Sequence, residues 1–332
     1  MPDFPWPSGA ATGIGSLPGT DIAEAQRLVM GELPDLPHLA ELPNRGPGSD
    51  MVGRTAGLLA ELPVQLYVGR WQMAPRPGKD QRHIADLLER DLDQLSEQAD
   101  RFAGTIKVQA AGPWTLAANL ELPIGGRMLR DAGAVRHLTE SLAEGLRRHV
   151  ADLRKRLPLA SVLLQLDEPS LPAVLAGHIP TESGLSAYKA VDGPDAATGL
   201  RTIVDAVGVP VIVHCCAPDV PLQVFRDAGA AAATLDLSLI KDLDPLGEAL
   251  EAGLGLFAGA ASTRPPADGR ALTSAQVAER VRKLWSRLGF PAARLPQQVV
   301  ITPACGLAGA SQPYVREVLK ACRDAGRRLA EV

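Results

Sequence analysis

Two short segments of the chain carry the side chains best suited to metal chemistry. His214-Cys215-Cys216 ends one apolar run, and Cys305 precedes a glycine at the end of another. Side chains alternate between two faces in an extended strand, so His214 and Cys216 point to one side and Cys215 to the other. One imidazole and two thiolates form a donor set that zinc accepts. We therefore predict that His214, Cys216 and Cys305 bind Zn²⁺ as a cofactor.

Asp236, at the end of a further apolar run, is the candidate for a fourth ligand. Ligands from separate strands require a preformed fold, which is typical of a catalytic site rather than a folding staple. The plain alternative is that these cysteines are small buried residues at strand ends. Cys322, inside the last helical segment, is expected to be a packing residue.

Two further segments suggest ligand binding. Asp167-Glu168-Pro169 follows an apolar strand, and its carboxylates indicate either a helix start or a site for a cation such as an amino group. Trp114, after Gly112-Pro113, is either a stacking platform for a flat ligand or a tryptophan that seals a loop. The remaining histidines are expected at the surface or in caps, and they are His38, His83, His137, His149 and His178.

The elements that must position these residues alternate along the chain. Eight short apolar runs, bounded by Gly, Pro, Asp or Ser, are separated by longer amphipathic or loop segments. The runs lie near Ala11–Ser16, Val64–Gly69, Thr105–Ala111, Ser161–Asp167, Val209–His214, Ala231–Asp236, Leu254–Gly259 and Gln298–Pro303. Apolar strands that alternate with helices predict a parallel sheet, and eight of them predict an α/β fold of the (β/α)8 TIM barrel type. An open doubly wound sheet is the alternative, but Pro18 interrupts the only glycine-rich turn that resembles a dinucleotide fingerprint.

Helical spacing and domain organisation follow from the same pattern. Helical periodicity is clearest in Ile84–Phe102, Ala134–Leu157, Ala275–Leu288 and Pro313–Leu329. The proline-rich segment 33–62 is expected to be a long inserted loop. We therefore predict one catalytic domain over 1–332, with the reactive residues at the carboxyl ends of the barrel strands.

Composition excludes several classes of protein. The 332 residues are 46% hydrophobic and 22% charged, with 34 Lys and Arg against 38 Asp and Glu. No dense basic run is present, so nucleic acid is not an expected partner. No apolar stretch approaches the roughly 18 residues that a membrane span needs. The N-terminus lacks the pattern of a signal peptide, and four cysteines are too few for a disulfide framework, so we expect a cytoplasmic protein with reduced thiols.

Taken together, seven motifs resemble the C-terminal catalytic barrel of cobalamin-independent methionine synthase, within the uroporphyrinogen decarboxylase-like and methionine synthase-like superfamily. They occur in the family's order over nearly the whole chain. They are Ile14-Gly-Ser-Leu-Pro for I-G-S-F-P, Asp50-Met-Val for D-M-V, Gly112-Pro-Trp-Thr for G-P-V-T, Leu164-Gln-Leu-Asp-Glu-Pro for Q-I-D-E-P, His214-Cys-Cys for H-x-C, Thr234-Leu-Asp-Leu-Ser for I-E-T-S and Pro303-Ala-Cys-Gly-Leu for P-D-C-G-L.

The resemblance implies a methyltransferase that methylates homocysteine in methionine biosynthesis. It implies zinc on His214, Cys216 and Cys305, with Asp236 replacing the family's Glu ligand. It further implies that the substrate carboxylate is bound by the backbone of Ile14, Gly15 and Ser16 and by the Ser16 hydroxyl. The amino group would bind Asp167, and the other substrate-binding candidates are Trp114 and Glu41.

Four departures from the family concern mainly the methyl donor. Asp236 is one methylene shorter than Glu, and Glu41 is displaced from the family's acidic position before D-M-V. Ser262-Thr263-Arg264 stands where the family has a D-x-H that assists folate chemistry, and a single barrel without the duplicated N-terminal barrel is expected. The donor is therefore a folate or a methylcorrinoid. The alternatives are a metal-free decarboxylase that uses Arg45, Arg70 and Arg264, and a paralogue that binds thiol or metal without catalysis.

Overall fold

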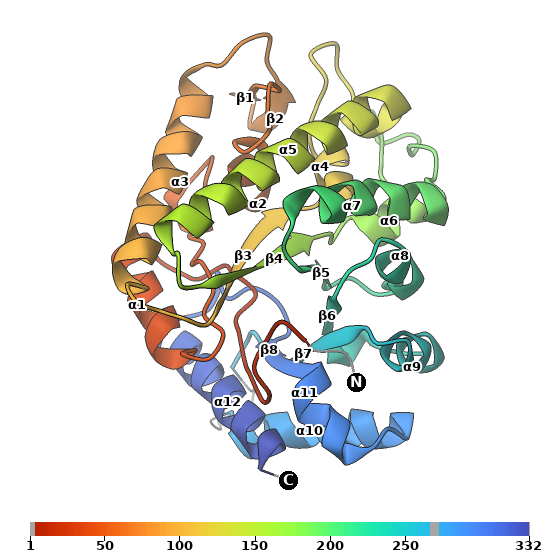
Figure 1. The fold of residues 1–332 in the computed structure, drawn as a ribbon. Coiled ribbons are helices and arrows are strands. Elements are labelled where there is room, and N and C mark those ends of the chain that lie inside the picture. Colours follow the sequence, from red (N-terminus) through yellow and green to blue (C-terminus); the bar gives the residue numbers. More distant parts are fainter. Residues whose placement is uncertain (1–3, 266–271, 332) are drawn as a thin grey trace.

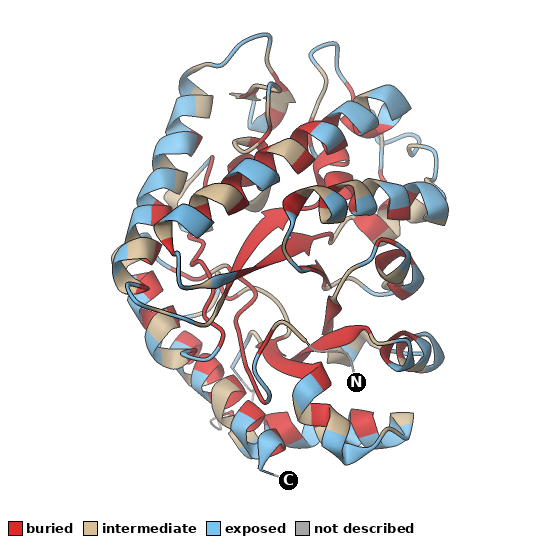
Figure 2. Ribbon diagram, viewed as in Figure 1, coloured by how far each residue is buried: buried red, intermediate tan, exposed pale blue. Residues whose placement is uncertain are grey.

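The computed structural model describes residues 4–265 and 272–331, and a parallel sheet of six strands forms its centre (Figure 1). Neighbouring strands in the sheet are also neighbours along the chain. The strands are β3 Thr105–Ala111, β4 Ser161–Asp167, β5 Val211–Cys215, β6 Ala232–Asp236, β7 Gly255–Ala261 and β8 Val299–Pro303. All six are almost wholly buried (Figure 2), as expected for strands covered on both faces. The predicted runs match these strands to within two residues at either end.

Helices connect the strands and cover the outer face of the sheet (Figure 1). They are α1 Ile22–Glu32, α2 Met51–Ala56, α3 Lys79–Gln98, α4 Pro113–Ala117, α5 Ala132–Arg156, α6 Leu171–Leu175, α7 Gly193–Val207, α8 Leu222–Asp227, α9 Asp244–Glu251, α10 Ser274–Leu288, α11 Leu295–Gln298 and α12 Gln312–Ala330. Side chains of Asp131, Asp192, Thr273 and Ser311 cap the first turns of α5, α7, α10 and α12. The helices predicted from periodicity are therefore confirmed, with the start of α3 five residues earlier than expected.

The prediction was wrong for the first two strands. Val64–Gly69 does not join the parallel sheet, because β1 Val64–Tyr67 pairs antiparallel with β2 Arg70–Met73 in a hairpin. Val68 and Gly69 both have positive φ at the hairpin turn, which suits the twist of a two-residue connection. Ala11–Ser16 forms only isolated bridges, since glycines at 13 and 15 weaken a regular ladder.

Two irregular segments, residues 10–17 and 37–42, lie between β8 and β3, and we call them the opening segments. Ala11 bridges Ile301 of β8, Ser16 bridges Glu41, and His38 bridges Lys107 of β3, all in parallel orientation. The proline-rich region 33–62 is thus more than an inserted loop, because it contributes one opening segment and helix α2.

On the inner face of the sheet, a layer of apolar side chains lies below a layer of polar side chains that is nearer the carboxyl ends of the strands. The apolar layer contains Trp6, Ala10, Leu36, Leu163, Ile212, Ala232, Phe257 and Val300. Residues two positions further along a strand face the same side and form the next layer. This polar layer contains Thr12, His38, Lys107, Gln165, His214, Thr234 and Thr302, all of them buried. Polar side chains therefore collect toward the carboxyl ends of the strands.

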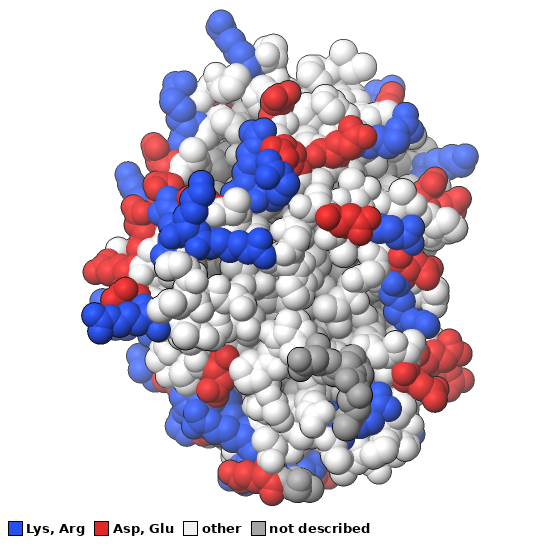
Figure 3. All heavy atoms as spheres, in the orientation of Figure 1, with Lys and Arg blue, Asp and Glu red and all other residues white. Residues whose placement is uncertain are grey.

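The surface has charges of both signs. On the face drawn in Figure 3, basic and acidic side chains occur side by side. Within the described residues, no helix is both long and apolar enough to cross a membrane.

Candidate active site

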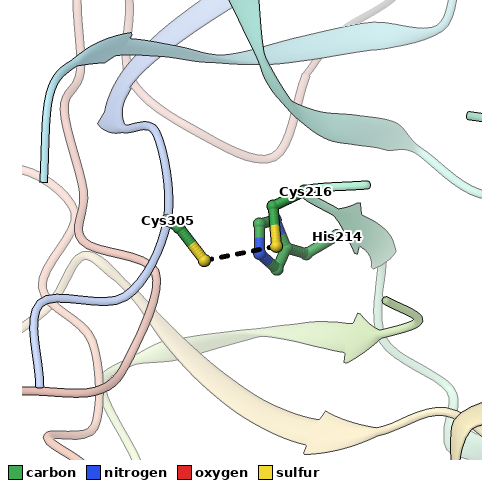
Figure 4. Close-up of side chains that lie close together, drawn as sticks. All are labelled: His214, Cys216 and Cys305. Atoms are coloured by element: carbon green, nitrogen blue, oxygen red, sulfur yellow. Dashed lines mark hydrogen bonds between the residues drawn. The ribbon is translucent and has the colours of Figure 1, made fainter. Parts of the chain in front are cut away.

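Three potential metal ligands converge at the carboxyl ends of β5 and β8. His214 lies in β5, Cys216 directly follows it, and Cys305 follows β8 by two residues. Their ligand atoms all lie within 4.8 Å of one another, and the two Sγ atoms are 3.2 Å apart (Figure 4). Tertiary structure thus brings together the three residues that were predicted from separate segments.

The electrostatics of this group favour a cation. A hydrogen bond from the Cys216 thiol and the neighbouring His214 lower the pKa of Cys305 to about 4, while the same contact and burial raise the pKa of Cys216. His214 Nδ1 is buried and pairs with no group in the part of the chain that the structure describes. A thiolate, a second thiol and an unpaired imidazole nitrogen are a donor set that fits a zinc ion.

Asp236 does not belong to this group of ligand atoms in the described residues. Its Oδ1 accepts hydrogen bonds from the backbone N–H of Ser238 at 2.8 Å and from its hydroxyl at 2.7 Å. The carboxylate is therefore engaged in capping the turn Leu237–Leu239, and its role as fourth ligand stays a prediction. Cys215 and Cys322 are buried away from the group, so packing explains Cys322 as expected.

The backbone around Gly15 and Ser16 lies next to the metal ligands. A Cβ atom at residue 306 would lie 2.1 Å from Ser16 Oγ, so a larger residue beside Cys305 would displace the Ser16 hydroxyl. The Ser16 carbonyl accepts a hydrogen bond from Leu307 N–H at 2.8 Å. Within the described chain, the backbone N–H groups of Gly15 and Ser16 have no hydrogen-bond acceptor. Free N–H groups of this kind can bind a carboxylate.

Two buried carboxylates face this backbone. Gln165 Nε2 donates to Asp167 Oδ1 at 2.7 Å, and burial raises the pKa of Asp167 although this hydrogen bond opposes the shift. Glu41 forms an ion pair with Arg54 and accepts a hydrogen bond from Gln109, and burial raises its pKa to about 7. A positively charged group at this position would find two acceptors.

Comparison with known proteins identifies the family. The family model for the catalytic domain of cobalamin-independent synthase matches residues 10–328. The chain belongs to this family. The family consists of methyltransferases, and methionine synthase is its namesake activity.

Solved structures share the fold. A B12-independent methionine synthase from Shewanella sp. W3-18-1, in complex with selenomethionine, is 13% identical with a TM-score of 0.59, and the match covers 98% of each chain. A methyltransferase from Methanosarcina mazei is 14% identical with a TM-score of 0.53, covering 99% of this chain and 95% of the other. No curated protein sequence matches the chain.

Within the synthase fold, Glu168 and Trp114 have structural partners. Glu168 is fully buried and accepts hydrogen bonds from the N–H groups of Trp114 and Thr115 at the start of α4. The Trp114 indole is buried and donates to Ala196 O in α7 at 2.9 Å. Glu168 thus caps a helix that follows another strand, and the substrate-binding role of Trp114 stays a prediction.

The position of the family's D-x-H has no acid or histidine here. The end of β7 consists of Gly259, Ala260 and Ala261. In the turn that follows, the Ser262 hydroxyl donates to Arg264 O, and Tyr314 Oη donates to the carbonyls of both residues. The turn is therefore held by its own hydrogen bonds.

Sequence reasoning missed the polar residues that support the synthase site. Lys107, Gln109 and Gln165 face the interior, and an alternation of polar residues within otherwise apolar strands was the available signal. The expectation of surface or capping histidines was wrong for His38 and His149, which are buried. Their sequence context lacks long apolar runs, so burial could not be inferred locally.

Proposed function

We propose that this synthase-family chain transfers a methyl group to the thiol of homocysteine, with zinc held by His214, Cys216 and Cys305. The convergence of these three ligands beside the Gly15–Ser16 backbone carries the proposal. Coordination to zinc lowers the pKa of a thiol, so the sulfur reacts as a thiolate near neutral pH. In the reaction the sulfur–methyl bond forms, the donor–methyl bond breaks, and the thiol proton is released.

The chain's own residues bind the amino-acid end of the substrate. Gly15 and Ser16 N–H groups and the Ser16 hydroxyl receive the carboxylate, while Asp167 and Glu41 accept hydrogen bonds from the ammonium group. The structure of the Shewanella enzyme with selenomethionine, an analogue of the product, supports a methionine-shaped site. The thiol then extends toward Cys305, because Gly306 places that segment against Ser16.

Asp236 is proposed as the ligand that fills the fourth position while no substrate is bound. Both hydrogen bonds from Ser238 go to its Oδ1, so Oδ2 would be the ligand atom.

The end of β7 favours a methylcorrinoid donor over a folate. A folate leaving group is a nitrogen anion that needs a proton, whereas a reduced corrinoid leaves without one. Ser262, Thr263 and Arg264, which follow β7 at the position of the family's D-x-H, include no carboxylic acid or imidazole for such a proton. We therefore propose a methylcorrinoid, with methyltetrahydrofolate as the second candidate.

Ion pairs disfavour the alternative of a metal-free decarboxylase. Two of the arginines that such an enzyme would use are already paired, Arg45 with Asp91 at 2.7 Å and Arg70 with Glu121 at 2.8 Å.

We also propose that the two opening segments complete the six strands to a (β/α)8 barrel, since parallel bridges join them to β8, to each other and to β3.

Metal analysis is the decisive test. Mass spectrometry of protein purified without added metal should give about one zinc per chain, and Cys305→Ser should lose it. Cys322→Ala is the matched control, because Cys322 is buried in α12 outside the ligand group. Zinc in the wild type and its loss in Cys305→Ser only would support the site, and a donor screen with homocysteine would follow. No zinc after reconstitution would refute the proposal.

A further inference from the structure

Lys107 is the buried lysine of the polar layer, and burial lowers its pKa to about 7. It lies in β3 with its side chain fully buried, among the largest such side chains of the protein. Its Nζ donates to the backbone carbonyl of Ile14 at 2.9 Å and to Gln165 Oε1 at 2.7 Å. An ammonium group inside a protein is costly unless it is paired and hydrogen-bonded. Its partners therefore indicate what the lysine holds in place.

Gln165 extends this contact to a predicted substrate ligand. Its Nε2 donates to the same Ile14 carbonyl at 2.9 Å and to Asp167 Oδ1 at 2.7 Å. We call the linked pair the Lys107–Gln165 bridge. The bridge joins the backbone just before Gly15 to the carboxylate of Asp167, although these two groups belong to different elements.

The backbone that the bridge holds is supported by scattered bonds instead of a ladder, since Glu41 N–H donates to Gly15 O at 3.1 Å and Leu307 N–H donates to Ser16 O at 2.8 Å. Between Thr12 N–H, which donates to Ile301 O, and Leu17 N–H, which donates to Glu41 O, the opening segment has no regular ladder. Glycines at 13 and 15 add conformational freedom to it. Two side-chain donors on the Ile14 carbonyl therefore replace the ladder bonds that a strand would have.

We infer that Lys107 is a positioning residue for the amino-acid end of the substrate. It fixes the spacing between the N–H groups of Gly15 and Ser16, which receive a carboxylate, and Asp167, which receives an ammonium group. This inference rests on the proposed function for the identity of the substrate. Its consequence is specificity: the bridge favours α-amino thiols over thiols that lack either charged group.

Binding of L-methionine to the zinc-loaded protein, measured by calorimetry, tests the inference. Lys107→Met should weaken binding by about 30-fold or more and leave the zinc content unchanged. It should also reduce the preference for homocysteine over 4-mercaptobutanoate, which lacks the amino group. A raised KM for homocysteine with a smaller change in kcat would agree with a positioning role.

Gln298→Leu is the matched control. Gln298 is also buried, and its Nε2 donates to two backbone carbonyls, Leu250 O at 2.7 Å and Leu254 O at 2.8 Å, at the opposite end of β8. Gln298→Leu removes a pair of buried hydrogen bonds comparable to the pair that Lys107→Met removes, so a general loss of stability would appear in both variants. Its affinity for methionine should stay within about twofold of the wild type.

A second variant protects the test against misfolding. Gln165→Leu cuts the bridge at its other member without removing a charge, and it should weaken methionine binding in the same direction. Wild-type affinity in Lys107→Met, or equal weakening in Gln298→Leu, would overturn the inference alone. A wild type that holds neither zinc nor methionine would overturn the proposed function and this inference with it.

Discussion

The metal side and the amino-acid side of this site are built in different ways. His214, Cys216 and Cys305 lie at or just after the ends of β5 and β8, which pair in parallel with their sheet neighbours, with one register shift between β7 and β8 at Gly259 and Ala261. Gly15 and Ser16 lie in an opening segment that makes only isolated bridges. A regular ladder uses the backbone N–H groups and leaves side chains to act, which suits metal ligation. An interrupted ladder leaves N–H groups free, which suits a carboxylate.

On the amino-acid side, the backbone of the opening segments lacks a regular ladder and is held by other hydrogen bonds. Buried side chains supply some of these bonds: Lys107 and Gln165 bond Ile14 O, Gln109 bonds Leu39 O, and Gln26 bonds His38 O. Other polar atoms of the polar layer have no partner in the described chain on either side, among them the hydroxyls of Thr12, Thr234 and Thr302.

The largest expected effect comes from breaking the metal side alone. Cys216→Ser should remove the metal and lower turnover by more than the roughly 100-fold that changes around a metal site typically cause. Methionine affinity should remain within a few-fold, because the amino-acid side is untouched. Metal analysis and calorimetry on the same sample check both statements. Joint loss of metal and methionine binding would mean that the two sides are not separable.

Substitutions of the adjacent carboxylates Asp167 and Glu168 separate substrate binding on the amino-acid side from stability. Asp167→Asn should weaken methionine binding by about 10- to 100-fold, because a hydrogen bond to a charged group contributes roughly 1.5–3 kcal/mol. Glu168→Gln should instead lower the free energy of unfolding by about 1–3 kcal/mol through the weakened α4 cap. Calorimetry and denaturant unfolding of both variants separate the roles. Equal effects on methionine affinity would show that Glu168 also faces the substrate.

The pH dependence of stability sharpens the contrast between the two carboxylates. Burial raises the pKa of Glu168 to about 7, above the value of 4.5 in the unfolded chain. The folded state therefore binds the extra proton, and its stability is fully present below pH 4.5 and falls as pH rises to about 7, by at most about 3 kcal/mol. Glu168→Gln should flatten the unfolding free energy across this window. An unchanged slope would assign the effect to Glu41, which titrates in the same range.

The smallest expected effect concerns the unused hydroxyls of the metal side. Thr302→Val keeps the side-chain shape and removes a buried hydroxyl that pairs with no described group. Such a replacement is nearly neutral or stabilising, here by about 1 kcal/mol or less. Thermal unfolding measures it. A clear loss of stability would show that an internal water bonds this hydroxyl, so that the metal side also relies on its polar layer.

The strands β3 to β8 and the long helices could be predicted from the sequence, and His214, Cys216 and Cys305 could be proposed from it as metal ligands. Each of these signals is local: apolar runs, helical periodicity, and the alternation that places His214 and Cys216 on one side. The order of seven motifs also identified the family, which the match over residues 10–328 confirmed. Parallel strands bring their carboxyl ends to one edge, so strand prediction was enough to bring His214, Cys216 and Cys305 together.

The family resemblance predicted Gly15, Ser16 and Asp167 for the amino-acid side, but the contacts that arrange them depend on the tertiary structure. Val64–Gly69 reads as a barrel strand, yet it forms a hairpin, while the proline-rich segment that reads as a loop lies beside β3. Glu168 caps α4 although its partner Thr115 lies 53 residues earlier in the chain, and Lys107 bonds Ile14, which lies 93 residues before it. Such bonds depend on which polar groups meet in the interior after the chain has packed. A buried donor takes whichever carbonyl the interrupted ladder leaves open, and no local pattern specifies that choice.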